Sequence, residues 1–169
     1  MTRRSLLLAV SLVTFAACSG GSDQTTSGGG DSFVSDIAAA AAAVEAALGG
    51  PQEFFEITAT PQLTNVFVAI DGGTAALPYI YLDGELQAPA PRIDGATGQT
   101  FTAGAIDFDE ATVLVGVEID LPNATIDAFS VEGGPGGFVR YVVSARSEQG
   151  GVLDIVVAPS GAVIEVDLL

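Results

Sequence analysis

The chain has 169 residues, with 21 acidic side chains, five basic ones, no histidine and a net charge of −16 at pH 7. A field of this sign repels nucleic-acid phosphates, so we expect no nucleic-acid partner. Ser-His-Asp and Cys-His catalytic arrangements both need a histidine, and they are excluded. A carboxylate pair of the kind that cleaves glycosides stays open among the 21 acidic residues, but the chain has no tryptophan and few aromatic side chains to stack against a sugar. We therefore expect a non-enzyme that holds no metal and no cofactor.

The first 17 residues are ordered like a secretory signal peptide. Arg3 and Arg4 precede an apolar stretch, Leu6–Val13, and the small residues Ala16 and Ala17 follow it. The apolar stretch is shorter than the roughly 20 residues that a bilayer-spanning helix needs. The sequence therefore predicts export through the Sec pathway, or through the twin-arginine pathway, whose signals residues 2–7 (TRRSLL) resemble.

The single cysteine of the chain directly follows this stretch, in the order Phe15-Ala16-Ala17-Cys18. These four residues resemble a bacterial lipobox, the motif at which a lipoprotein signal peptidase cuts. The resemblance implies that Cys18 becomes the lipid-modified first residue and anchors the protein to the membrane on its extracytoplasmic face. The alternative is an ordinary secretory signal that happens to end in cysteine.

Residues 18–31 combine this cysteine with a stretch rich in glycine and serine. Such a composition cannot bury enough apolar area to offset the entropy lost on ordering. We expect residues 18–31 to be a flexible tether and residues 32–169 to form one folded domain.

An amphipathic helix is expected at the start of this domain, over residues 32–48. Asp31 and Ser32 offer capping oxygens, and the chain is broken after the helix by Gly49-Gly50-Pro51. One apolar stripe recurs every three or four residues, formed by Phe33, Ile37, Ala41, Val44 and Leu48.

After residue 52 the apolar period changes to two, which is typical of strands. Asp71-Gly72-Gly73 and Asp83-Gly84 mark turns between them. We predict antiparallel strands over residues 53–60, 64–70, 77–82 and 85–88, followed by a loop up to residue 100.

The second half of the domain echoes the first. Residues 66–73 (VFVAIDGG) match 140–151 (RYVVSARSEQGG), residues 79–86 match 154–163, and residues 54–61 match 126–135. We therefore predict two repeats, 32–90 and 101–169, in an α+β fold of helix-plus-antiparallel-sheet units, αβββ in order, with the helices on one face of the sheet.

The repeat predicts a second helix over residues 107–121, in which Asp107 and Glu110 would form a capping pair. Local propensity disagrees, because Val113, Val115, Val117 and Ile119 alternate as in a strand. We predict the helix, since Pro122-Asn123 mirrors Gly50-Pro51 at the junction with the next strand.

The closing stretch, residues 138–169, contains two apolar strands around the turn Pro159-Ser160-Gly161. It resembles the end of a PepSY-type module, and two such units side by side resemble the tandem repeats of beta-lactamase-inhibitor proteins. The resemblance implies a binding or inhibitory module, such as a modulator of a peptidase.

Three clusters of residues are considered as sites, and only the first, Arg140 with Arg146, remains a candidate binding surface. Arg140 and Arg146 lie six residues apart on one predicted strand, so they share a sheet face, opposite Val139, Tyr141 and Val143. They mark either a binding surface for an anionic group or a pair of surface ion pairs. The acidic run Asp107, Asp109 and Glu110 suits a helix start better than a calcium site, and residues 133–137 suit a hairpin loop.

Together these features predict a lipid-anchored binding module of the bacterial cell envelope. We expect its partners to be the membrane, through the lipid on Cys18, and an envelope protein or a small ligand. The alternative function is a carrier of an apolar or lipid ligand, which would need a cavity between the sheet and the helices.

Overall fold

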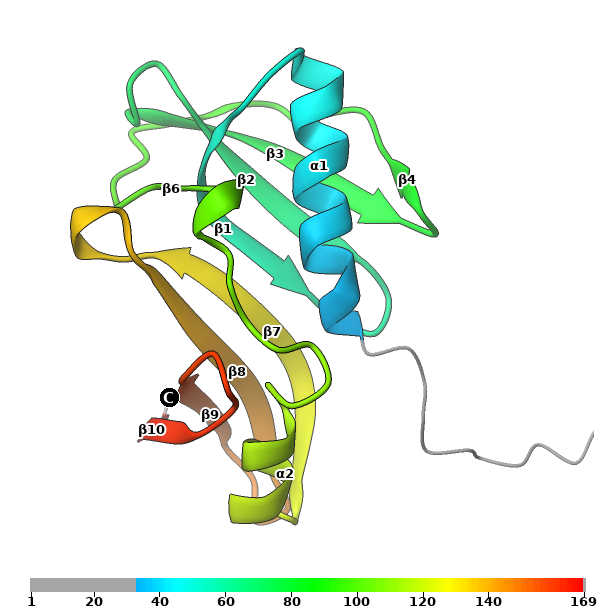
Figure 1. Ribbon diagram of the computed structural model, residues 1–169, viewed down its shortest axis with the longest axis vertical. Helices are drawn as coiled ribbons and strands as arrows, with labels where there is room; N and C mark the ends of the chain where they lie inside the picture. Colours follow the sequence, from blue (N-terminus) through cyan, green and yellow to red (C-terminus); the bar gives the residue numbers. More distant parts are fainter. Residues whose placement is uncertain (1–32, 169) are drawn as a thin grey trace, which may run out of the picture. The chain divides into compact units, whose positions relative to one another are not determined.

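The structure is a computed structural model that describes residues 33–168. The predicted signal peptide, the lipidation site Cys18 and the tether lie outside the described residues. Residues 33–168 form one antiparallel sheet with one main helix, an α+β arrangement as predicted (Figure 1).

Every strand pair in this sheet is antiparallel, and the spatial order is β10-β9-β8-β7-β1-β2-β3-β4. The first half supplies β1 (Glu53–Ala59), β2 (Thr64–Ile70), β3 (Ala75–Leu82) and β4 (Glu85–Leu86). The second half supplies β7 (Ala124–Gly133), β8 (Val139–Ser147), β9 (Val152–Val157) and β10 (Val163–Leu168). Two short strands lie off this path: β5 (Ile93–Asp94) pairs with β3, and β6 (Phe101–Thr102) pairs with β1.

The two halves are joined by the pairing of β1 with β7, in which Ile57 lies opposite Val131. The four strands predicted for the first half are confirmed, although β3 begins two residues before the predicted start and β4 ends two residues before the predicted end. The halves thus share one continuous sheet.

Helix α1 (Asp36–Leu48) lies against β1, β2 and β3, after a short 3-10 turn, η1 (Phe33–Ser35) (Figure 1). Ile37, Ala41 and Val44 are buried against the sheet, as the apolar stripe predicted. The prediction was wrong for Leu48, which is 41% exposed, because the buried positions of the helix end at Val44. The helix also begins four residues later than predicted, and the residue before it, Ser35, makes no side-chain capping bond.

The prediction of a helix over residues 107–121 was largely wrong: only α2 (Val115–Asp120) is helical. The reason is that backbone groups earlier in the segment bond to distant parts of the chain. Asp107 N–H donates to the hydroxyl of Tyr141, and Asp109 N–H donates to the carbonyl of Pro159. Residues 107–109 are therefore held against the sheet in a non-helical conformation. The predicted capping pair of Asp107 and Glu110 does not form.

Residues 103–114 and α2 cover the second half of the sheet on the face that α1 covers in the first (Figure 1). In this segment Phe108 packs edge-on against Phe129 and Tyr141, with ring centroids 5.0 and 5.6 Å away. Val113 and Val117 are completely buried in the same core as Ile37 of α1. One hydrophobic core thus runs through both halves.

The turn between β9 and β10 is held against α2 by a close backbone approach. A Cβ at Gly116 would lie 1.8 Å from the carbonyl oxygen of Gly161, so only glycine fits. Gly161 itself has φ +86°, a conformation that favours glycine. This contact fixes the position of β10 relative to α2.

Candidate functional site

An open groove of about 580 Å³ lies where β8 and β10 begin and β9 ends. We call it the Phe138 groove. It is lined mainly by apolar side chains from the second half of the chain: Ala105, Val139, Tyr141, Val156, Val157, Ala158, Pro159 and Ile164, with Asp107, Gly137, Phe138 and Arg140. Concave and mostly apolar surfaces with a few polar groups are the usual form of binding sites.

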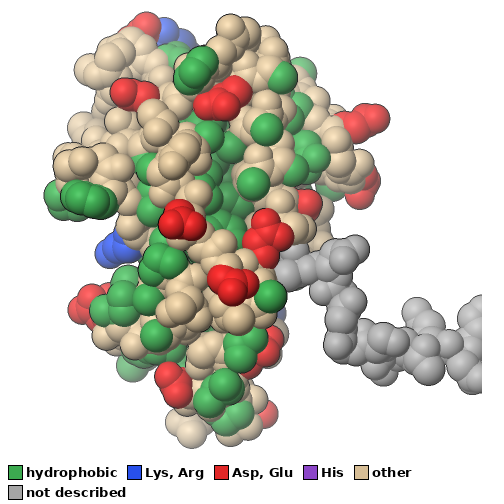
Figure 2. All heavy atoms as spheres, in the orientation of Figure 1, with side chains coloured by type: hydrophobic (Ala, Val, Ile, Leu, Met, Phe, Trp, Pro, Cys, Tyr) green, Lys and Arg blue, Asp and Glu red, His purple; other side chains and the backbone are tan. Residues whose placement is uncertain are grey.

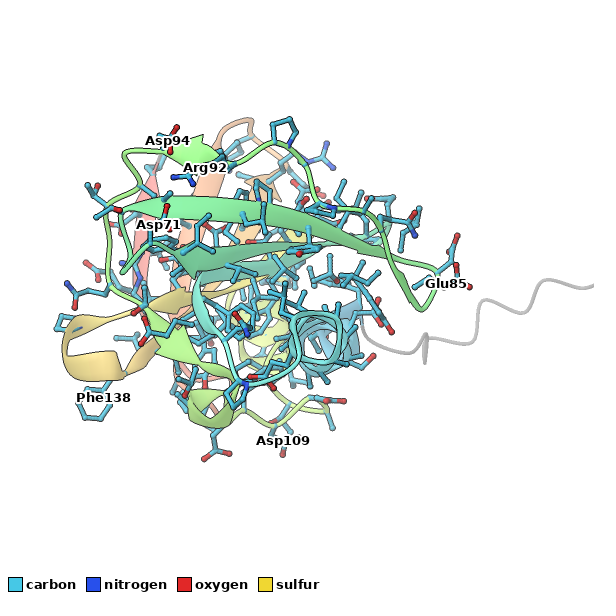
Figure 3. The ribbon with its side chains drawn as sticks, turned by 90° about the horizontal axis from the view of Figure 1, so that it is seen from above. Asp71, Glu85, Arg92, Asp94, Asp109 and Phe138 are labelled. Atoms are coloured by element: carbon cyan, nitrogen blue, oxygen red, sulfur yellow. The ribbon has the colours of Figure 1, made fainter. Side chains whose placement is uncertain are left out.

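Phe138 stands at the rim of this groove, 75% exposed, and points away from the protein (Figure 3). It is presented by the loop between β7 and β8, in which Gly136 and Gly137 have φ of 75° and 80°. The loop is closed by a 2.7 Å hydrogen bond from Gly134 N–H to the carbonyl of Phe138. The prediction of a hairpin loop over residues 133–137 is confirmed.

Sequence reasoning missed Phe138 as a site residue, although a signal was present. Phe138 is two positions before Arg140, so the period of two places it on the side opposite Val139 and Tyr141. A large aromatic side chain at such a position, next to a glycine-rich loop, has few neighbours to cover it.

Tyr141 forms part of the floor of the groove and is 3% exposed. Its hydroxyl accepts a 2.9 Å hydrogen bond from Asp107 N–H and donates a 3.0 Å bond to the Asp107 carbonyl. Burial raises the pKa of Tyr141, while the Asp107 hydrogen bond opposes the rise. The phenol is therefore neutral near pH 7, and its hydroxyl connects the backbone of Asp107 to β8.

Arg140 and Arg146 both lie exposed on β8, with buried Tyr141, Val142 and Val143 between them in the strand. Each pairs with a carboxylate on the neighbouring strand. Arg140 Nη2 is 2.8 Å from Glu132, and Arg146 holds Asp127 through two bonds of 2.6 and 2.7 Å. The hydrogen bond to Asp127 raises the pKa of Arg146. Of the two interpretations that the sequence left open, this geometry matches surface ion pairs, and only Arg140 lines the groove.

Arg92 is the third arginine of the described residues, and it lies between Asp71 and Asp94 (Figure 3). Its Nη2 atom is 2.8 Å from Asp71 and 2.6 Å from Asp94. Within residues 33–168 every arginine is thus already paired with a carboxylate.

Carboxylates outnumber these arginines and are spread over the surface. Figure 2 shows them scattered across the face that carries α1 rather than gathered in one place. Among the described residues, no group of three potential metal ligands is placed to hold an ion. Asp109, part of the acidic run considered for calcium, instead accepts a 2.9 Å hydrogen bond from Ala111 N–H and closes a turn.

The space between α1 and the sheet is filled by apolar side chains. Val34, Ile37, Val44 and Phe54 are all completely buried there. The Phe138 groove lies on the opposite half of the sheet and opens to solvent. Within residues 33–168 this apolar hollow is therefore at the surface and not under α1.

Among the helices of residues 33–168, none has the length and apolar character needed to cross a membrane. Comparison of the chain with family models, curated proteins and solved structures gave no match in any of the three.

Proposed function

We propose that this protein is a lipid-anchored binding module of the cell envelope, without catalytic activity, whose partner docks at the Phe138 groove. The observation that carries the proposal is the exposure of Phe138 at the rim of an apolar groove. Burying such a side chain contributes about 1.5–3 kcal/mol, and aromatic side chains of this kind are common anchors at interfaces.

The membrane location rests on residues 1–31. The charged, apolar and small-residue order of the first 17 residues supports export, and Cys18 at the end of the lipobox-like motif supports lipid attachment. In this proposal the tether, residues 18–31, joins the lipid to the domain on the extracytoplasmic face of the membrane.

We also propose that the two halves are repeats of one αβββ-type unit. The strand order runs outward from the β1–β7 pair as β2-β3-β4 on one side and β8-β9-β10 on the other. Thr58 and Ser130, which are 72 residues apart, face each other across this pair, with their hydroxyl oxygens 2.8 Å apart. Two repeats related by a twofold axis would bring such equivalent residues together.

This arrangement supports the resemblance to PepSY-type and tandem-repeat inhibitor modules, in which the partner is a protein. Modulation of an envelope peptidase is the specific form of the proposal. The carrier function is the weaker candidate, because the groove is open and the space under α1 is filled.

The test is site-specific photocrosslinking of the full chain in cells that produce it naturally. The photoreactive residue p-benzoylphenylalanine replaces Phe138 in one variant and Glu85 in a matched control. Glu85 is exposed and lies on the far side of the domain from Phe138 (Figure 3).

We expect one discrete, light-dependent protein adduct at position 138 and none at position 85. Equal labelling at both positions, or no adduct at position 138, would show that the groove is not a docking site. A lipid adduct confined to position 138 would favour the carrier function instead.

A further inference from the structure

The two edges of the sheet differ in how they are covered. The outer edge of β3 is occupied by β4 and β5, and Gln87 and Ala90 bond from the same segment to the carbonyls of Ile80 and Pro78. Pro89 and Pro91 in this segment cannot donate backbone hydrogen bonds to a further strand. At the other edge, no strand within residues 33–168 pairs with the outer side of β10.

The side chains of β10 protect this edge only in part, because Glu165 and Asp167 are charged but the residues between them are apolar and exposed. Ile164, Val166 and Leu168 are 66%, 45% and 80% exposed, and β10 contains neither proline nor lysine. Its irregularity is confined to its start, between Val163 and Glu165, after which it pairs regularly with β9. Proteins generally avoid an exposed apolar edge strand, because its unpaired backbone groups can form hydrogen bonds with a strand of another chain.

Apolar exposure continues from β10 onto α2. Val166 pairs with buried Ile155, which places Val166 on the sheet face that α2 covers. On α2, Val115 and Ile119 are 40% and 70% exposed, and their spacing of four places them on one side of the helix. An added strand would therefore meet apolar side chains on this face.

The opposite face of the same edge is acidic. Glu165 and Asp167 alternate with the apolar residues, and Asp167 pairs directly with Asp154 on β9. Within residues 33–168, no arginine pairs with any of these three carboxylates. An added strand would gain energy from basic side chains on this face.

We propose that the outer edge of β10 binds an extended segment of a partner protein in which basic and apolar side chains alternate. The segment adds one strand to the sheet, directs its basic side chains toward Glu165 and Asp167, and directs its apolar ones toward Val166 and α2. Ile164 belongs both to β10 and to the Phe138 groove, so the edge continues the docking site. The inference rests on the proposed binding function and names the chemistry of the partner.

A second copy of this chain is a poor occupant of the same edge. Two β10 strands that paired antiparallel about Val166 would place Glu165 of each copy opposite Asp167 of the other. Like charges directly opposite each other destabilise a strand pair. The partner is therefore a different, basic chain.

The test titrates the isotope-labelled full chain with a blocked peptide of alternating lysine and valine, followed by amide NMR. One control peptide replaces lysine by glutamate. Another keeps the lysines but carries an N-methyl group on every backbone amide, which preserves its charge and removes the backbone donors on both of its edges.

We expect the lysine peptide to shift the amide signals of residues 163–168 and to protect from exchange those amides that point away from β9. We expect neither control peptide to do so. The double substitution Glu165→Gln, Asp167→Asn should weaken binding by about fivefold, the effect of roughly 1 kcal/mol from two cross-strand charge pairs. The matched variant Asp83→Asn, Glu85→Gln removes the same charge at the far side and should bind as the unmodified protein does.

Equal binding of the N-methylated peptide would overturn the proposal, because it would show attraction by charge alone. Shifts confined to the Phe138 loop would also overturn it, while leaving the proposed function intact. A third outcome would also overturn the proposal: the unmodified chain does not bind the peptide, and the Glu165→Gln, Asp167→Asn variant associates with itself. The occupant of the edge would then be a second copy of this chain. Peptide pairing at β10 without a crosslink at position 138 would contradict docking at the Phe138 groove and would support the β10 edge as the binding site.

Discussion

At the scale of single residues, one side-chain oxygen among the described residues is buried without a hydrogen-bond partner. Thr64 at the start of β2 is completely buried, and within the described residues its hydroxyl makes no hydrogen bond. Thr60, four residues earlier, has the opposite situation, because its hydroxyl donates a 2.9 Å bond to the Leu63 carbonyl. The two threonines form a matched pair for substitution.

Thr64→Val should raise the free energy of unfolding by about 1 kcal/mol, because valine has nearly the same shape and no unsatisfied hydroxyl. Thr60→Val should lower it by a similar amount. Urea denaturation of the two variants measures both effects. A loss of stability on Thr64→Val would show that its hydroxyl has a partner in solution.

Tyr141, in the floor of the Phe138 groove, makes two hydrogen bonds with the backbone of Asp107. Tyr141→Phe should lower the free energy of unfolding by about 1 kcal/mol at pH 7, because the Asp107 backbone loses its partner. Burial raises the pKa of Tyr141 above the ordinary value of 10.0. The neutral phenol therefore stabilises the fold fully below about pH 10, and this contribution is lost as the pH rises through the higher folded pKa.

The stability difference between the unmodified protein and Tyr141→Phe should consequently shrink as the pH is raised above 10. Urea denaturation at pH 7 and at the highest pH that the fold tolerates measures it. A difference that grows with pH would contradict the buried, neutral state of Tyr141.

At the scale of secondary structure elements, the contact of α2 with the β9–β10 turn decides where β10 lies. Gly116→Ala should lower the free energy of unfolding by about 1–3 kcal/mol, because the new Cβ would overlap the Gly161 carbonyl. A Cβ added at Gly104 would meet nothing within 4 Å, so Gly104→Ala serves as the control. Equal thermal unfolding of the two variants would contradict the close contact.

Secondary structure elements also differ in how far the sequence alone predicts them. Residues 36–48 and the strands of the first half were predictable, because their apolar periods of 3.6 and two reflect local geometry. The 107–121 segment was not, because its backbone bonds to Tyr141 and Pro159, and these partners depend on the finished sheet.

The candidate site was also predictable from the sequence only in part. The shared face of Arg140 and Arg146 follows from their even spacing on one strand. Their partners, Glu132 and Asp127, follow from the register of β7 against β8, which shifts between Ile126 and Ala128. A single sequence contains no signal for that shift.

At the scale of the whole molecule, the excess of acidic over basic side chains, 21 against five, lowers the stability of the fold. Repulsion among the carboxylates opposes the compact state, and the described ion pairs are exposed and contribute little. Sodium chloride should therefore raise the unfolding temperature by several degrees between about 0.01 and 1 M, as screening shortens the range of repulsion.

Differential scanning calorimetry measures this dependence, and potassium chloride at the same concentrations controls for specific ion binding. A fall in the unfolding temperature with either salt would mean that attractive ion pairs outweigh the repulsion.

The proposed function depends most on where the domain is held, since a tethered module can meet only partners at the membrane surface. The direct measurement is the intact mass of the full chain purified from membranes, compared with Cys18→Ser. We predict a chain that begins at Cys18 with covalently attached lipid, and a variant that loses both the lipid and the membrane fraction. An unmodified chain found free in the medium would contradict the lipid anchor and the membrane-bound function proposed with it.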